Sequence, residues 1–152
     1  MRIVTKPDDA PKLGEDLCFA IYSANLAFGN AYRPILAQLG LTCTQFLTMV
    51  ALWEEGKQTV SNLGKKLFLE SNTLTPILKK LEEKGVVRRQ INPEDERQVW
   101  ISLTRHGHRL RQRALDVDLV EATGLAPGEY ATMRKAVAIL RDNLLKSGKS
   151  SA

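Results

Sequence analysis

The feature that most constrains the fold is a change of hydrophobic period in the middle of the chain. From residue 59 to residue 85, in TVSNLGKKLFLESNTLTPILKKLEEKG, apolar residues recur at helical spacing around a tight Glu-Ser-Asn turn. The next segment, VVRRQINPEDERQVWISL, alternates apolar and polar residues after the turn-forming stretch Asn92-Pro93-Glu94-Asp95. Two short helices, a tight turn and a hairpin predict a winged helix-turn-helix over residues 59–104.

The ends of the two short helices can be placed from their capping residues. Ser61 is expected to cap the first helix, which ends near Leu69, and Ser71 or Asn72 the second, which ends at Gly85. Pro76 suits only the first turn of the second helix, so that helix should begin no earlier than about Ser71. Its expected buried stripe consists of Leu74, Ile77, Leu78 and Leu81.

A long helix and a second helix are expected before this module, after a loose arm over residues 1–12. The long helix lies between residues 13 and 39, and Pro34 should bend or end it near Arg33. The alternative is a helix that continues past Pro34 with a kink. Thr42 and Gln45 have the spacing of a capping box at the start of the second helix. The long helix carries one apolar stripe, formed by Leu17, Ile21, Ala24, Phe28, Ala31 and Ile35.

Two further helices are expected after the module. The first runs from Thr104 to about Thr123, and Gly124 breaks it. The last has Pro127 in its first turn and carries an apolar stripe formed by Tyr130, Met133, Val137, Leu140 and Leu144. A small module cannot bury the stripes at both ends of the chain, whereas pairing them across a two-fold axis would. We therefore expect a homodimer.

The expected fold class is thus mainly α, an α+β winged helix with long N- and C-terminal dimerisation helices. Residues 13–58 and 105–147 are expected to form the dimerisation parts and residues 59–104 the DNA-binding part of one intertwined domain. With 152 residues, neither a signal-peptide run nor a membrane span, and two cysteines outside zinc-ligand spacing, the chain is expected to be cytoplasmic. No metal and no cofactor are expected.

The charge distribution favours a polyanion as partner. Residues 57–113 carry 13 Lys and Arg against 6 Asp and Glu, a net of +7, although the whole chain has only +5. A basic middle between slightly acidic ends is typical of a nucleic-acid-binding module, here for double-stranded DNA. The alternative is a solvated helical face, and charge alone does not separate the two.

Four segments together resemble a known family. DLCFAIYSA, AYRPIL, LFLESNTLTPILKKLEEKG and DERQVWISLT resemble the MarR group of winged-helix repressors, and within it the regulators that sense organic hydroperoxides, often called OhrR. The resemblance covers nearly the whole chain. It implies a dimeric repressor that binds a pseudo-palindromic operator while reduced, and leaves it when a cysteine near the N-terminus is oxidised.

The candidate DNA-binding residues lie on the second short helix and on the hairpin. Small hydrogen-bonding side chains at the front of a helix suit base readout, whereas lysines suit phosphates. The resemblance implies that Arg97 enters the minor groove and that Asp95 orients it; the alternative is a surface ion pair of Arg97 with Glu94 or Glu96. The other candidates are Ser71, Asn72, Thr73, Thr75 and Lys79, with Lys65, Lys66 and Lys80 as further phosphate contacts.

Cys18 is the candidate sensor. It falls near the first turn of its helix, where free N–H groups favour a thiolate, although Glu15 and Asp16 oppose it. Tyr22 shares its face and can donate a hydrogen bond to that thiolate. Taken alone, a free cysteine is more often a small buried hydrophobe. The resemblance favours sensing, and implies that Tyr32 reaches Cys18 of the partner subunit.

Cys43 departs from the family pattern, which usually has a tyrosine at this place. If the partner subunit lies as close as the resemblance implies, Cys43 could resolve an oxidised Cys18 of that subunit as an intersubunit disulfide. The alternatives are capping of oxidised Cys18 by a small thiol, or a Cys43 that only fills the place of the tyrosine. Phe19, Phe28, Phe46 and Met49 could line an apolar pocket for the hydroperoxide.

Three other functions remain open at this point. A related repressor could be released by a small aromatic or phenolic ligand without cysteine oxidation. A thiol peroxidase lacks support, since no CxxC and no peroxidase-like constellation surround Cys18, and no enzyme activity is expected. A protein-interaction scaffold is disfavoured by the basic middle segment.

Overall fold

The computed structural model describes residues 10–150, so residues 1–9 of the expected arm lie outside the described residues. The chain is mostly helical with one small sheet, which confirms the expected fold class. Among residues 10–150, no helix is both long enough and apolar enough to cross a membrane. The elements are η1 (Leu13–Glu15), α1 (Leu17–Ala37), α2 (Cys43–Glu55), β1 (Gln58–Thr59), α3 (Val60–Leu67), α4 (Ser71–Glu83), β2 (Val87–Asn92), β3 (Asp95–Leu103), α5 (Arg105–Ala114), η2 (Glu121–Thr123) and α6 (Pro127–Ser150).

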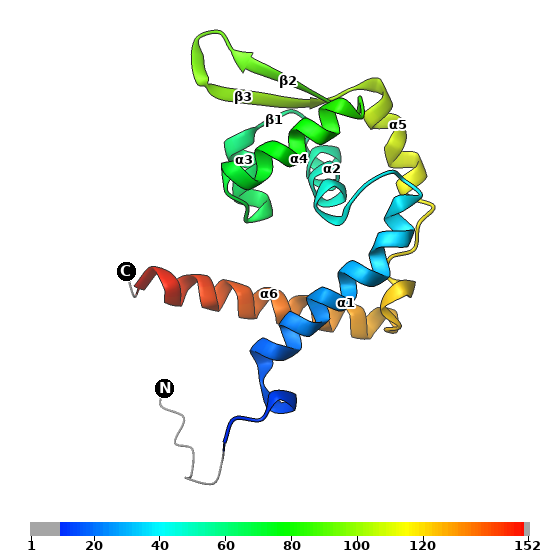
Figure 1. Cartoon of the computed structure of the whole chain (residues 1–152), viewed down its shortest axis with the longest axis vertical. Coiled ribbons are helices and arrows are strands. Elements are labelled where there is room, and N and C mark those ends of the chain that lie inside the picture. Colours follow the sequence, from blue (N-terminus) through cyan, green and yellow to red (C-terminus); the bar gives the residue numbers. More distant parts are fainter. Residues whose placement is uncertain (1–9, 151–152) are drawn as a thin grey trace.

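The predicted winged helix-turn-helix is present. β2 and β3 pair antiparallel, from Val87 opposite Leu103 to Asn92 opposite Asp95, and the hairpin turns at the expected residues. A third strand, β1, was not expected; it adds to β3 with the order β1-β3-β2. In Figure 1 the hairpin lies at one end of the molecule, and α1 and α6 lie at the other.

The hydrophobic core lies where the winged module packs against the end of α1, α2 and α5. The buried apolar side chains of the described residues run from Leu36 to Leu110, and the fully enclosed ones include Leu52, Leu63 and Leu81. Of α1, only the last turns contribute to this core, and α6 has no residue in it. Most of α1 and all of α6 therefore lie outside the core of the single chain.

The caps of the two short helices differ from the expectation. Thr59, not Ser61, caps α3, because its side chain accepts a hydrogen bond from the Asn62 N–H at 3.1 Å. Glu70 is the N-cap of α4 and makes no side-chain cap, so neither Ser71 nor Asn72 serves as one. The helix still begins at Ser71. Its first-turn side chains are thus free of a capping role.

Both prolines lie inside helices, and only Pro76 lies deeper than expected. α1 continues through Pro34 to Ala37, because Pro34 falls in the last turn and removes only one helical hydrogen bond. Pro76 is the sixth residue of α4 rather than a first-turn residue. It leaves the Asn72 carbonyl without a helical donor, and exposure of Asn72 lets water serve instead.

The helix expected to reach Thr123 ends at Ala114. Asp116 and Asp118 follow it, where negative charge opposes the dipole at the end of a helix. Asp118 instead accepts a hydrogen bond from the Glu121 N–H at 2.9 Å and so begins the short turn η2. A separate connection therefore leads from α5 to α6, and Gly124 ends η2 with a φ of 71°.

Gly107 sets how closely α5 approaches the start of the hairpin. A Cβ at this position would overlap the Val86 carbonyl oxygen and lie 3.2 Å from a Leu103 methyl group. We expect Gly107→Ala to lower the free energy of unfolding by roughly 1–3 kcal/mol or more, since backbone must move to admit the methyl group. Urea unfolding measures this. Gly128→Ala, with open space around it, is the control, and an equal decrease in both variants would contradict the argument.

Candidate nucleic-acid interface and cysteine sites

The N-terminal half of α4 presents polar side chains to solvent. Ser71, Asn72 and Thr73 are exposed, and Thr75 is half-buried with its hydroxyl donating to the Ser71 carbonyl at 2.7 Å. Three leucines of the same helix lie beneath this face in the core: Leu74, Leu78 and Leu81. The helix is therefore anchored by its apolar side while its small hydrogen-bonding side chains face outward, as base readout requires.

The lysines of this surface are not equivalent. Lys65 and Lys79 are exposed. Lys80 lies 3.4 Å from Glu83, and Lys66 is ion-paired with Glu55 and largely covered. Lys66 is thus held against α2 rather than free for the phosphate contact expected of it.

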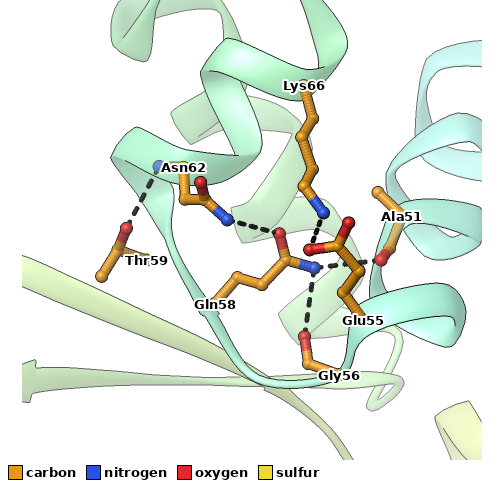
Figure 2. Close-up of polar contacts among 7 residues, drawn as sticks. All are labelled: Ala51, Glu55, Gly56, Gln58, Thr59, Asn62 and Lys66. Carbon is orange, nitrogen blue, oxygen red and sulfur yellow. Dashed lines mark hydrogen bonds and ion pairs between the residues drawn. The ribbon is translucent and has the colours of Figure 1, made fainter.

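A polar network fixes the connection that leads into α3. The Gln58 side chain, 4% exposed, donates to the Ala51 carbonyl at 3.0 Å and to the Gly56 carbonyl at 3.2 Å. Its oxygen accepts from the Asn62 amide at 3.0 Å. Figure 2 shows these contacts beside the Lys66–Glu55 pair, all at the junction of α2 with α3. Because a buried amide with its hydrogen bonds satisfied resists displacement, the helix-turn-helix is held rigidly on α2.

The structure brings Asp95 and Arg97 together at the start of β3. One Asp95 oxygen accepts from the Arg97 N–H at 3.1 Å and from the guanidinium Nε at 3.4 Å. The Arg97 side chain is 95% exposed. Its ion pair is therefore with Asp95 and not with Glu94 or Glu96, and the pair orients an arginine that remains open to solvent.

Cys18 is exposed on the second residue of α1. Asp16 is the N-cap, and its carboxylate accepts from the Phe19 N–H at 2.7 Å. Tyr22 lies one turn farther along and is also exposed. The alternative that Cys18 is core filling is wrong for the single chain, because Cys18 does not belong to the core or to the residues packed against it.

Cys43 lies in a different environment. It is half-buried as the first residue of α2, after the expected capping box, in which Thr42 and Gln45 bond reciprocally. It opens into a groove of about 550 Å³ that Gly29 and Arg33 of α1 also line. Since Gly29 lies eleven residues after Cys18, the groove is about 16 Å along the helix from Cys18. The two cysteines of one chain therefore cannot pair, because a disulfide needs Cα atoms within about 7 Å.

Tyr32 is directed toward its own chain. Its hydroxyl donates to the Leu119 carbonyl at 3.2 Å, and its ring meets Phe28 edge-on with centroids 5.3 Å apart. Burial raises the pKa of Tyr32 above its ordinary 10.0, and Tyr130 and Cys43 raise it further. The phenol therefore stays protonated at neutral pH and remains a hydrogen-bond donor close to Cys43.

Comparison with known proteins identifies the family of this chain. Residues 30–113, more than half of the chain, match the family model described as transcriptional regulator SarA/Rot. The chain belongs to this family. This confirms the resemblance to MarR-type winged-helix regulators.

Individual relatives agree with this family. The regulator TtmR of Methylorubrum extorquens (strain PA1) is 44% identical over 92% of this chain and 73% of its own length. The organic hydroperoxide resistance transcriptional regulator of Bacillus subtilis (strain 168) is 41% identical over 72% of this chain and 74% of its own length.

Solved structures give the same assignment. Reduced AbfR bound to DNA is 36% identical, covers 88% of this chain and 93% of its own, and has a TM-score of 0.74. A disulfide-formed structure of AbfR covers 88% and 90%, with 35% identity and a TM-score of 0.60. The SarA/Rot-family chain is thus a transcriptional regulator of the winged-helix type.

Two cations of this regulator bind carbonyls at the end of α1, and sequence reasoning missed both. Lys84, the C-cap of α4, donates to the Gly40 carbonyl and, at 3.0 Å, to the Gln45 side-chain oxygen. Arg113 of α5 donates to the Gln38 carbonyl. Positive side chains suit the negative end of a helix dipole. The Gln45 oxygen also accepts the capping-box bond beside Cys43, so α4 is connected to the start of α2.

The four residues expected to line one apolar pocket are dispersed in the single chain. Met49 is fully buried in the core, and Phe46 packs against that core and edge-on against Trp53. Phe19 lies near the start of α1. Only Phe28 of the four lines the cavity between α1, η2 and α6, which has a volume of about 340 Å³. Its other lining residues are Thr123, Leu125, Tyr130, Met133, Arg134, Val137, Ala138 and Arg141.

Side chains of the types that ligate metals are scattered over the described part of the chain. Among those residues, no three or more His, Cys, Asp and Glu side chains are grouped so as to hold an ion. Both histidines, His106 and His108, are exposed on α5.

Proposed function

We propose that this regulator is a homodimeric repressor that binds double-stranded DNA while reduced and releases it when an organic hydroperoxide oxidises Cys18. The observation that carries the proposal is the position of Cys18 on α1. It is an exposed thiol at the start of a helix that leaves most of its large apolar side chains exposed in the single chain. Its hydroperoxide-regulator relative in B. subtilis supports this effector.

DNA would be read from two elements. The exposed first turn of α4, with Ser71, Asn72 and Thr73, would enter the major groove of the DNA. Thr75 would contact the edge of a base, and Lys79 the phosphate backbone. Arg97, oriented by Asp95, would enter the adjacent minor groove. Lys65 would add a phosphate contact. In a dimer the two recognition helices would read half-sites about 34 Å apart in a pseudo-palindromic operator. The DNA-bound structures of AbfR support this arrangement.

The dimer would form through the terminal helices. Large apolar side chains are exposed along η1, α1 and α6, among them Leu13, Leu17, Ile21, Tyr22, Leu26, Phe28, Met133, Val137, Ile139, Leu144 and Leu145. A monomer rarely leaves so many unburied on neighbouring helices. Residues 13–58 and 105–147 would thus form the dimerisation frame, and residues 59–104 the reading part, of one intertwined domain.

The oxidation of Cys18 would take place in two steps, formation of a sulfenic acid and then of a disulfide. The thiolate attacks the terminal oxygen of the hydroperoxide, the O–O bond breaks, and the alcohol leaves with a proton. Cys18 becomes a sulfenic acid. Cys43 of the partner subunit then attacks the sulfenic sulfur, a disulfide forms and water leaves.

The groove beside Cys43 supports this second step. It is open along α1 near Gly29, where a Cβ would meet no atom within 4 Å. Tyr22 would flank the Cys18 thiol as a hydrogen-bond donor, and Tyr32 would have to exchange its Leu119 acceptor for a thiol to act in the same way.

Three contacts would transmit the change to the DNA-binding part. Lys84 connects α4 with the capping box beside Cys43, and Arg113 connects α5 with the end of α1. In the second half of α6, the Arg141 guanidinium lies 4.7 Å from the centre of the Phe68 ring, in the turn between α3 and α4. A shift of α1, α2 or α6 therefore reaches both ends of the recognition helix.

Non-reducing gel electrophoresis tests the disulfide. Treatment with cumene hydroperoxide should convert most wild-type protein into a covalent dimer that dithiothreitol reverses. Cys18→Ser and Cys43→Ser should each remain monomeric on the gel, because each removes one of the two sulfurs. A wild-type protein that loses its DNA affinity without forming a covalent dimer would exclude Cys43 as the resolving residue, and mass spectrometry would then identify the adduct on Cys18.

The cavity lined by Phe28 and Tyr130 favours a second candidate function, release by a small aromatic or phenolic ligand without cysteine oxidation. Its wall is mostly apolar, and its volume of about 340 Å³ suits one aromatic ring system. The two candidates differ in one observable. Ligand-induced release would persist in Cys18→Ser, whereas release by hydroperoxide would disappear.

A further inference from the structure

Arg89 occupies an apolar position of the wing. It lies on β2 opposite Ile101, which is fully buried. Because side chains alternate along a strand, Arg89 shares its face with Val87, which is buried, and with Val99 of β3, which packs against the core. Arg88 points to the other face and is exposed. A charged side chain has thus been placed where the sheet faces the helices.

No partner in the described part of the chain neutralises this guanidinium. Its Nε is buried and has no hydrogen-bond partner, and no ion pair involves the side chain among those residues. An unpaired, partly buried cation is costly, and native proteins rarely retain one without a ligand or a functional reason. The position therefore points to an anion that approaches from outside.

The surroundings of Arg89 define the site. It lines a hollow of about 440 Å³, with both polar and apolar walls, between the start of α3, the first half of α4 and the middle of the hairpin. Arg97 and Gln98 of β3 line the same hollow together with Ser71 and Thr75 of α4, and none of its lining residues is acidic. The Asp95 carboxylate lies beside it, bonded to Arg97, and the Thr75 hydroxyl donates to the Ser71 carbonyl. Guanidinium groups with hydroxyls and an amide are the donors that hold phosphate oxygens.

We infer that Arg89 binds a backbone phosphate of the DNA between the base-reading turn of α4 and the arginine of the wing. This inference rests on the proposed DNA binding. The hollow lies between Ser71 and Arg97, the two groups assigned above to the major and the minor groove. The strand that passes between two adjacent grooves presents its phosphates at that place. Arg89 thus positions the duplex relative to the protein, so that α4 and the wing reach two neighbouring grooves of the same DNA.

Salt dependence of DNA binding tests the assignment. The probe is a duplex selected by the wild-type protein from random sequence, with a scrambled duplex beside it, in 50–200 mM KCl. The slope of log K against log salt should become less steep in Arg89→Gln by about 0.9 for each phosphate that the protein no longer neutralises, hence about 1.8 for a dimer. Affinity should fall by roughly ten- to a hundredfold per protomer on both duplexes, because a phosphate contact carries no sequence information.

Two variants control for charge and folding. Arg88→Gln removes the same charge from the opposite face of the same strand and should change the slope by less than half as much. Arg89→Lys keeps a cation in the hollow and should retain most of the slope. Thermal melts of each variant without DNA show whether the fold survives; if Arg89→Gln does not fold, the comparison of Arg89→Lys with Arg89→Met replaces it.

Several outcomes would overturn the inference. An unchanged slope in folded Arg89→Gln would do so, as would an equal change in Arg88→Gln, which would reflect net charge alone. Stabilisation of the wild type by inorganic phosphate that disappears in Arg89→Gln without any change in the slope would assign the hollow to a small anion instead. A wild-type protein that binds neither duplex would contradict the proposed function itself, and is distinguishable from all of these.

Discussion

Replacement of Cys18 by serine is expected to leave DNA binding by the reduced protein intact and to abolish its release by organic hydroperoxide. Serine cannot accept the peroxide oxygen, and Cys18, exposed in the single chain, does not pack against its core, so the change should not disturb the fold. In the wild type, oxidation should lower affinity by roughly 5- to 150-fold, the usual range of coupling between two sites. In Cys18→Ser the two affinities should agree. Fluorescence anisotropy with and without cumene hydroperoxide measures both.

Cys43→Ser is the matched control because it removes the other thiol of the described chain. This variant should still form a sulfenic acid on Cys18, which a dimedone probe would label, and should not reach the disulfide. Retained release in Cys43→Ser would mean that oxidation of Cys18 alone suffices. Undiminished release in Cys18→Ser would contradict the sensing role and favour a ligand in the cavity beside Tyr130.

Local patterns were enough to predict the winged module. The spacing of apolar residues changes from helical to alternating at Val99, Ile101 and Leu103, and this change predicted the hairpin. Its turn lies at the predicted turn residues, Asn92 to Asp95. The capping box of Thr42 and Gln45 formed as expected, since both partners lie within one turn. Such features depend on residues close in sequence, and short-range geometry determines them.

Features that depend on distant contacts were missed. β1 has only two residues, too few for any period, and forms only because β3 lies beside it. The helix after Thr104 was expected to continue because its composition is helical. It ends at Ala114, and Asp118 accepts a hydrogen bond from the Glu121 N–H at the start of η2. Helix ends depend on what each side chain can bond, which a pattern of apolar residues does not report.

In the candidate site, too, contacts between residues close in sequence could be predicted, and most contacts between distant residues could not. Asp95 and Arg97 are two residues apart, and their pairing agrees with the expectation. Lys84 contacts Gly40 across 44 residues, and Arg113 contacts Gln38 across 75, so neither contact had a local signal. Arg89 did have one: it interrupts the apolar alternation of β2. A charged residue at an inward strand position is a feature that sequence analysis can search for.

The second large effect concerns the terminal helices. Val137→Asp combined with Leu144→Asp should convert the dimer into a folded monomer, because it places two charges on the apolar stripe of α6, where these side chains are 40% and 61% exposed. Neither residue belongs to the core of the winged module, so that module should keep its structure. Light scattering measures the mass, and circular dichroism the helix content.

DNA affinity should then fall by a factor of about 10²–10⁴. In the dimer, binding of one recognition helix holds the second at a high effective concentration near its half-site, and the monomer lacks this linkage. The matched control is Ala136→Asp with Asn143→Asp, which adds the same two charges one residue earlier on a different side of α6. It should remain dimeric and bind DNA with at most a small electrostatic decrease in affinity. A Val137→Asp, Leu144→Asp protein that stays dimeric would show that α6 lies outside the interface. A monomer with wild-type affinity would mean that each chain reads DNA alone, and the two-fold operator would have to be abandoned.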